Sequence, residues 1–129
     1  MAKLERSIQD DFGFDFWYNR IVRGIVDGSV SASLEEHSDF RSGEARCAVC
    51  AFERYSFSGG NRVSLTVTLF QNGDGPIHLS AIATGGSQAT FFKVNTWGEE
   101  AFLDKLRDLL VLTPAEIGEL KYGSERRSF

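Results

Sequence analysis

The sequence has no long hydrophobic run, since polar residues interrupt every apolar stretch within a few positions. A helix that spans a bilayer needs about 20 consecutive apolar residues, so no membrane-spanning helix is expected. Residues 1–11 carry charges where a secretory signal peptide has its apolar segment. We therefore expect a cytoplasmic protein without a membrane partner.

Positive charge is scarce as well. The 129 residues include 14 lysines and arginines against 18 aspartates and glutamates, which gives a net charge of −4. Acidic residues outnumber basic ones in each of the segments 1–28, 29–92 and 93–129, and the only adjacent basic pair is Arg126-Arg127. Because DNA affinity depends largely on lysine and arginine contacts to phosphate, the sequence disfavours nucleic acid as a partner.

Familiar catalytic and nucleotide-binding motifs are missing too. The sequence contains no Gly-x-Ser-x-Gly elbow, no P-loop and no dinucleotide-binding glycine pattern. Its two cysteines, Cys47 and Cys50, have the spacing of redox pairs and of half a zinc site. Both uses need the two sulfurs on one side, whereas positions i and i+3 of a strand point to opposite faces. We therefore expect cysteines without a chemical role, no bound metal and no cofactor.

Hydrophobic periodicity predicts two main helices. Over residues 14–27 the apolar side chains recur at helical spacing, and Gly28 occupies the place of a left-handed C-terminal residue. Thr96-Trp-Gly-Glu99 is a capping-box sequence that predicts the start of a second helix, which runs through about Leu112. Thr113-Pro-Ala-Glu116 repeats this signal and predicts a short third helix to about Lys121.

Elsewhere the apolar residues recur with a period of two, which indicates strands. Residues 3–9 predict a short first strand, and four longer strands are predicted at 29–37, 45–57, 62–70 and 77–84. The connections Ser38–Gly43, Ser58–Asn61 and Gln71–Pro76 are rich in turn formers, and they are short enough to make consecutive strands antiparallel neighbours. Residues 89–94 are compatible with a further short strand or with an extended linker.

The predicted order is β-α-β-β-β-β-α with a short C-terminal helix, which is an α+β class. Two amphipathic helices and an antiparallel sheet with one apolar face form a two-layer sandwich, in which the helices cover one face. Residues 1–122 should form a single domain, followed by a flexible tail over 123–129. The phase of strand 45–57 stays open, because apolar and polar residues mix on both of its faces.

Three stretches carry a resemblance to a known family. They are Gly28-Ser-Val-Ser-Ala-Ser-Leu-Glu35, Glu53-Arg-Tyr-Ser-Phe-Ser-Gly-Gly-Asn-Arg-Val-Ser-Leu65 and Gly85-Gly-Ser-Gln-Ala-Thr-Phe-Phe-Lys-Val-Asn-Thr-Trp-Gly-Glu-Glu-Ala-Phe-Leu103. Over about residues 1–112 the chain resembles a small bacterial family of uncharacterised proteins, a domain of unknown function. The element order also resembles the fold of the TATA-box-binding protein repeat. Neither resemblance implies catalytic residues, and a shared fold does not imply a shared function.

The sheet face that the helices leave uncovered is the candidate functional surface. We expect it to present hydroxyl groups interrupted by a few apolar and aromatic side chains. A non-enzymatic module would use this face to bind a small molecule or another protein, and a homodimer is one such form. The residues assigned to this face are Ser64, Thr66, Thr68, Phe70, His78 and Ser80.

Two other functions stay open. A small enzyme would place His37 or His78 within hydrogen-bond reach of Glu35 or Glu53, in a concave pocket at the edge of the sheet. Nucleic-acid binding by the sheet face rests on the fold analogy alone. The two histidines complete a metal site with the cysteines only if the fold brings all four residues together.

Overall fold

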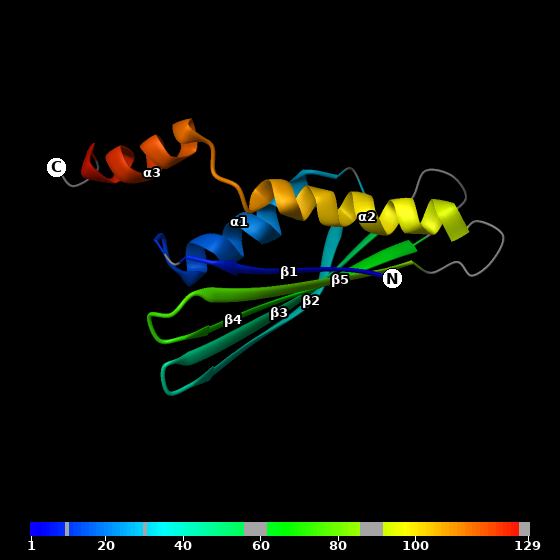
Figure 1. The fold of residues 1–129 in the computed structure, drawn as a ribbon, viewed down its shortest axis with the longest axis horizontal. Helices are drawn as coiled ribbons and strands as arrows, with labels where there is room; N and C mark the ends of the chain where they lie inside the picture. Colours follow the sequence, from blue (N-terminus) through cyan, green and yellow to red (C-terminus); the bar gives the residue numbers. More distant parts are fainter. Residues whose placement is uncertain (10, 30, 56–61, 86–91, 127–129) are drawn as a thin grey trace.

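The elements follow the order that the sequence predicts. The computed structural model describes residues 1–9, 11–29, 31–55, 62–85 and 92–126 (Figure 1). Residues 92–99 and 122–126 are described by their backbone alone. The chain runs through β1 (Ala2–Ile8), α1 (Phe14–Asp27), β2 (Ser33–Ser42), β3 (Ala45–Tyr55), β4 (Arg62–Asn72), β5 (Ile77–Gly85), α2 (Phe92–Leu109) and α3 (Pro114–Arg126). This order confirms the predicted α+β class.

The described strands form one antiparallel sheet in the order β1-β5-β4-β3-β2. Strands β2 to β5 follow one another as a meander, and β1 closes the far edge beside β5. Helices α1 and α2 lie over the same face of the sheet, while α3 extends beyond one end of it (Figure 1). No helix in the described part of the chain is long and apolar enough to cross a membrane.

The core lies between the sheet and the two covering helices. Val63, Leu65, Val67 and Leu69 of β4 are all buried, while the residues between them point to the other face. The same alternation settles the phase of β3, whose helix-facing residues are Ala48, Cys50 and Phe52. From the helices, the core receives Phe14, Trp17, Ile21, Ile25, Phe102, Leu103 and Leu106.

A glycine lets α1 and α2 pack closely. A Cβ atom at Gly24 would lie 2.2 Å from Cδ2 of Leu109, so the absence of a side chain makes room for α2. Gly28 has φ −82°, which is right-handed, so the predicted left-handed conformation is wrong. A Cβ at Gly28 would lie 2.1 Å from Cε of Lys105, at the flexible end of a side chain that can move. Of the two, Gly24 is therefore the residue that provides space for the neighbouring helix.

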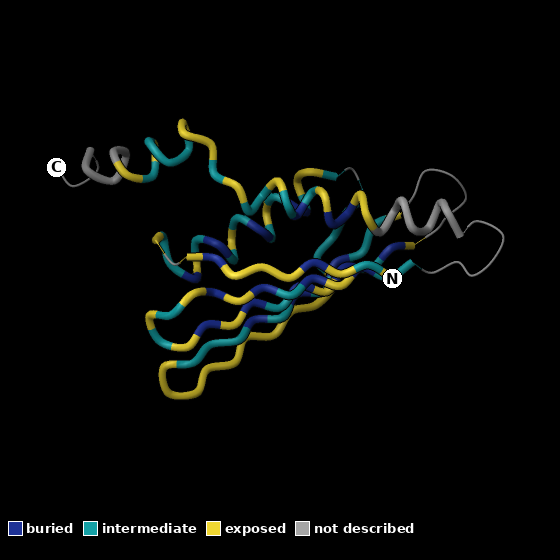
Figure 2. Tube along the Cα trace, viewed as in Figure 1, coloured by how far each residue is buried: buried dark blue, intermediate teal, exposed yellow. Residues whose placement is uncertain are grey.

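Strand β2 differs most from its prediction, because it begins at Ser33 rather than at residue 29 and continues to Ser42. The predicted turn over Ser38–Gly43 is therefore wrong except at its end. The chain reverses at Gly43, whose φ of 57° suits glycine, and Ser42 pairs with Ala45. The residues from Glu35 onward are exposed, and Figure 2 shows this hairpin reaching beyond the helices. Because both faces of this part of β2 meet water, its polar composition resembles that of a turn.

Of the two predicted capping boxes, the one at the start of α3 is correct and the one at the start of α2 is wrong. Thr113 and Glu116 form the box as predicted, since each backbone N–H donates to the other's side-chain oxygen at 3.1 Å. Helix α2, in contrast, begins at Phe92, so Thr96 lies inside it and residues 92–94 are not a strand. Residues 92–95 contain neither glycine nor proline, so nothing prevents an earlier start. The predicted turn at 58–61 and the stretch 89–91 lie outside the described residues.

Helix α3 is longer than the sequence predicts. It continues to Arg126 instead of ending near Lys121, so residues 123–126 of the expected tail are helical. The side chain of Arg20 connects this helix to α1, because Nη1 lies 2.5 Å from Oε2 of Glu116 and Nε donates to the Leu109 carbonyl at 2.6 Å. The start of α3 is thus held against α1 and the end of α2.

Candidate functional site

The six residues assigned to the uncovered face all lie there. We call this surface, opposite α1 and α2, the open face; it carries alternate residues of each strand. Across β4 and β5 the register pairs Thr68 with Ser80 and Phe70 with His78. Ser64 and Thr66 continue the same side of β4, since the residues between them are buried against the helices. The alternation in the sequence was sufficient to place these side chains.

An aromatic row crosses the open face from one edge to the other. The register places side by side Ser7 of β1, His78 of β5, Phe70 of β4, Cys47 of β3 and Phe40 of β2. The ring of His78 stacks on that of Phe70 with 6.5 Å between centroids, and its Nδ1 is hydrogen-bonded to Ser7 Oγ at 3.0 Å. Phe40 is 63% exposed and Phe70 is 41% exposed. Cys47 lies between Phe40 and Phe70 in this row, so the exposed rings form two groups on one face, and together they make the row a candidate interaction surface.

A shallow cavity of about 410 Å³ opens over the β1 end of this row. Its lining includes Thr68, Phe70, His78 and Ser80, together with Glu5 and Ser7 from β1. The enzyme hypothesis requires a histidine hydrogen-bonded to a carboxylate. Among the described residues no such bond is present, since His78 bonds to Ser7 and His37 is exposed on β2. The structure therefore brings four of the assigned residues together without an acid-base pair.

The two cysteines lie on opposite faces of β3. Cys47 belongs to the open face, whereas Cys50 is buried beneath the helices and hydrogen-bonded to Tyr18. Burial raises the pKa of the Cys50 thiol, and burial together with the Cys50 contact raises the pKa of Tyr18 to about 12. Both groups are therefore neutral at physiological pH. This geometry does not support a redox pair or a shared metal between the two sulfurs.

Arg46 lies on the same side of β3 as Cys50, and its guanidinium group contacts two carboxylates. Its guanidinium group lies 2.8 Å from Asp39 and 2.8 Å from Asp15, and it stacks over the ring of Phe14 at 4.2 Å. The hydrogen bond from Arg46 lowers the pKa of Asp39 below its usual value. These contacts join the start of α1 to the β2–β3 hairpin.

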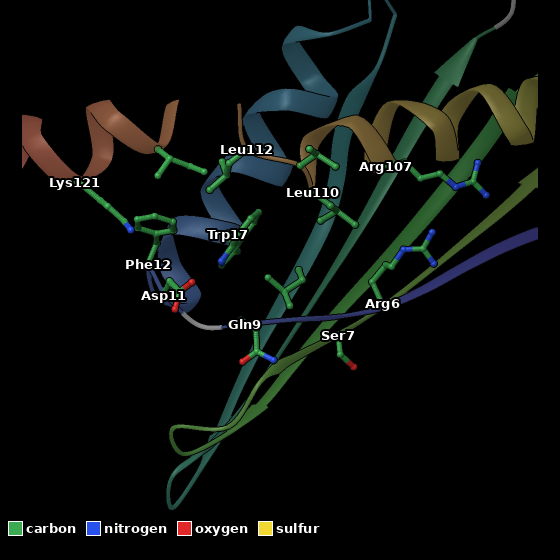
Figure 3. Close-up of a pocket in the computed structure, with 13 residues that line it drawn as sticks. Arg6, Ser7, Gln9, Asp11, Phe12, Trp17, Arg107, Leu110, Leu112 and Lys121 are labelled. Carbon is green, nitrogen blue, oxygen red and sulfur yellow. The ribbon is translucent and has the colours of Figure 1, made fainter. Parts of the chain in front are cut away.

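A larger cavity, of about 520 Å³, lies on the helix side of the sheet (Figure 3). We call it the β1–α3 cavity, because it is bounded by the end of β1, the start of α1, the end of α2 and α3. Its apolar wall is formed by Ile8, Phe12, Trp17, Leu110, Val111, Leu112 and Ile117. Its polar and charged residues are Arg6, Ser7, Gln9, Asp11, Arg107 and Lys121.

Sequence reasoning missed the β1–α3 cavity because no local pattern marks it. Its lining comes from four segments that extend along the chain from Arg6 to Lys121. Trp17 belongs to the apolar face of a helix, so periodicity assigns it only to the core. Arg6 is the one available signal, since it occupies an inward-facing position of β1, between Leu4 and Ile8, where an apolar residue is expected.

A family model for proteins of unknown function matches residues 1–112, from β1 to beyond the end of α2. The chain belongs to the DUF6054 family. Membership agrees with the resemblance found in the sequence, and it assigns no reaction, ligand or partner. No curated protein and no solved structure matches the chain. The likeness to the TATA-box-binding protein repeat therefore stays a prediction from element order.

The two candidate surfaces differ in their relation to the DUF6054 match. The open face lies wholly within the matched residues. The β1–α3 cavity lies mostly within them, but Ile117 and Lys121 come from α3, beyond residue 112. A wall of this cavity is thus built by a helix that the DUF6054 model does not cover.

Proposed function

We propose that this DUF6054 protein is a non-enzymatic interaction module whose open face binds the open face of a second copy, forming a homodimer. The observation that carries the proposal is the exposed aromatic row from Phe40 to His78. Beside it, Val49, Ala51 and Ile82 extend the apolar part of the same face. Two such sheets pack face to face in the manner of a β-sandwich.

The open face is large enough for a specific interface. Five strands spaced about 4.8 Å apart, each at least seven residues long at about 3.4 Å per residue, give a face of roughly 24 by 24 Å. Two copies would therefore bury somewhat more than about 1,000 Å² in total, which is the lower limit expected for a biological interface. We therefore expect the dimer to have a weak to moderate affinity.

Charge placement on the open face favours a two-fold symmetric arrangement. One cross-strand row begins with Lys3 on edge strand β1, passes through Thr66 on central strand β4 and ends with Glu36 on edge strand β2. If the two-fold axis runs along β4 between the sheets, β1 of each copy lies opposite β2 of the other. Lys3 then faces the partner's Glu36, twice per dimer, while Phe70 faces its own copy near the axis.

Sedimentation equilibrium on the full chain tests this arrangement. We expect a reversible dimer, weakened at least tenfold by Ile82→Lys, because the change brings a charge into the apolar interface. Val111→Lys is the matched control, since Val111 is an exposed aliphatic residue away from the sheet. A chain that stays monomeric at the highest concentration reached overturns the proposal.

A charge swap tests the symmetry of the dimer. Lys3→Glu or Glu36→Lys should each weaken the dimer about tenfold, because surface ion pairs contribute up to about 1 kcal/mol each and two pairs are lost. The double variant Lys3→Glu with Glu36→Lys restores opposite charges and should recover most of the affinity. Because Lys3 pairs with Glu5 of its own chain at 3.1 Å, all of these variants are made in a Glu5→Gln background. Failure of the double variant to recover in that background excludes the axis along β4.

A further inference from the structure

The β1–α3 cavity is a second candidate site, whose wall comes mainly from α1, α2, α3 and the end of β1, although Arg6 and Ser7 also line the cavity on the open face. Its volume of about 520 Å³ falls in the range of about 300–1,000 Å³ found for small-molecule sites. Most of its wall is apolar, as in such sites, and a few polar groups lie at its ends. What the cavity accepts can be worked out from those polar groups.

The most informative group is the indole N–H of Trp17. Trp17 is 4% exposed, and its Nε1 is the one described buried side-chain nitrogen or oxygen without a hydrogen-bond partner. Trp17 lines the cavity, and Figure 3 shows its ring nitrogen on the edge that faces Gln9 and Asp11. Because a buried donor without a partner is costly, an acceptor atom placed here would be bound favourably. An indole N–H only donates, so a ligand group that binds it must be an acceptor.

Positive charge dominates the other polar groups of the cavity. Arg6, Arg107 and Lys121 line it, against the single carboxylate of Asp11. Arg107 also pairs with Asp104 and Glu100, which do not line the cavity. The guanidinium group of Arg6 donates to the carbonyl of Glu5 at 2.9 Å and forms no ion pair with a described residue. Arg6 is therefore available to bind an anion, with Arg107 beside it (Figure 3).

The arginines and the indole N–H of Trp17 lie at different ends of the cavity. In Figure 3, Arg6 and Arg107 lie at one end, whereas Trp17, Asp11 and Lys121 lie toward the other, with Leu110 between them. A ligand that satisfies both ends needs a negative charge at one end, a neutral oxygen acceptor at the other and an apolar middle. A carboxylate suits the arginine end, because a guanidinium group binds it through two parallel hydrogen bonds.

We propose that the β1–α3 cavity binds an organic monocarboxylate with an apolar chain and a neutral oxygen at its far end. The carboxylate contacts Arg6, the chain packs against Leu110, Leu112 and Ile117, and the far oxygen accepts the hydrogen bond from Trp17. At the Trp17 end the opposite charges of Asp11 and Lys121 offset each other, which suits a neutral oxygen at that end of the ligand.

Calorimetric titration of the full chain with ω-hydroxydecanoate, below its critical micelle concentration, tests the proposal. We expect saturable binding. Decanoate lacks the far oxygen and the matching diol lacks the charge, so each should bind about tenfold more weakly, as expected for the loss of one hydrogen bond to a buried or charged group. Absence of saturable binding of the hydroxy acid, or equal binding of the diol, overturns the proposal.

Two variants assign the ends of the ligand. Arg6→Gln should weaken ω-hydroxydecanoate about tenfold, whereas Arg23→Gln, which removes an exposed cation on α1 that does not line the cavity, should leave its affinity unchanged. Trp17→Phe keeps a ring but removes the donor, so the hydroxy acid and decanoate should then bind equally. Equal effects of Arg6→Gln and Arg23→Gln contradict the placement of the carboxylate.

A spectroscopic measurement covers the case in which Trp17→Phe fails to fold. The chain has two tryptophans, so the indole N–H region of a nitrogen–proton correlation spectrum holds two signals. Trp97→Phe identifies the signal of Trp17 by elimination. At saturation with ω-hydroxydecanoate this signal should move downfield, and it should move less with decanoate. A Trp17 signal that does not respond overturns the proposed hydrogen bond.

Discussion

Replacing Gly24 by alanine should change the stability of the protein in two opposite ways, because Gly24 lies at the contact between α1 and α2. Alanine is preferred to glycine inside a helix by about 1 kcal/mol. The new methyl group, however, would lie 2.2 Å and 2.6 Å from the two terminal carbons of Leu109, so that side chain must move. Overpacking of this kind typically costs about 1–3 kcal/mol. We expect Gly24→Ala to lower the free energy of unfolding by up to about 2 kcal/mol.

A double-mutant cycle with Leu109→Ala isolates the steric part of this effect. In the Leu109→Ala background the space is free, so Gly24→Ala should raise the stability by about 1 kcal/mol, as its helix propensity alone predicts. The coupling between the two sites should thus be about 1–3 kcal/mol. Urea denaturation gives these values, provided that the m-value is the same for all four proteins.

The matched control is Gly118→Ala in α3. A Cβ atom at Gly118 meets nothing within 4 Å, so this change should not destabilise the protein. If Gly24→Ala stabilises the wild-type chain as much as it stabilises the Leu109→Ala variant, the coupling is zero. That result would refute the assignment of Gly24 as the residue that permits the close contact of the two helices.

Two further predictions concern the half-buried Tyr18 and the buried Cys50. The pKa of Tyr18 is raised from 10.0 to about 12, so its contribution to stability is complete below pH 10 and is lost as the pH rises toward 12. Tyr18→Phe should remove this alkaline loss of stability, as measured by denaturation at a series of pH values, whereas Tyr55→Phe should retain it. A thiol reagent should modify Cys47 in the native protein, and Cys50 only on unfolding, because Cys50 is 4% exposed and burial raises its pKa. In the Cys47→Ser variant, rapid labelling of native protein would contradict the burial of Cys50.

The sequence by itself determined the elements whose signals are local. The alternation of Val63, Leu65, Val67 and Leu69 defined both faces of the central strand, and helical spacing predicted α1 with the bounds that the structure shows. The capping box at Thr113 was also predicted correctly. In each case the deciding interactions join residues within a few positions of one another, so a short window of sequence contains the whole signal.

Only the tertiary structure decided which face of β3 is buried, how far β2 extends and where α2 begins. Cys47 and Cys50 both fit a core position, and the choice depends on Tyr18 and the helices that cover one side. The β1–α3 cavity is the clearest case, because Arg6, Trp17 and Lys121 meet only after four distant segments pack together. The physical reason is the same throughout: burial depends on which surfaces cover a residue, and those surfaces come from elsewhere in the chain.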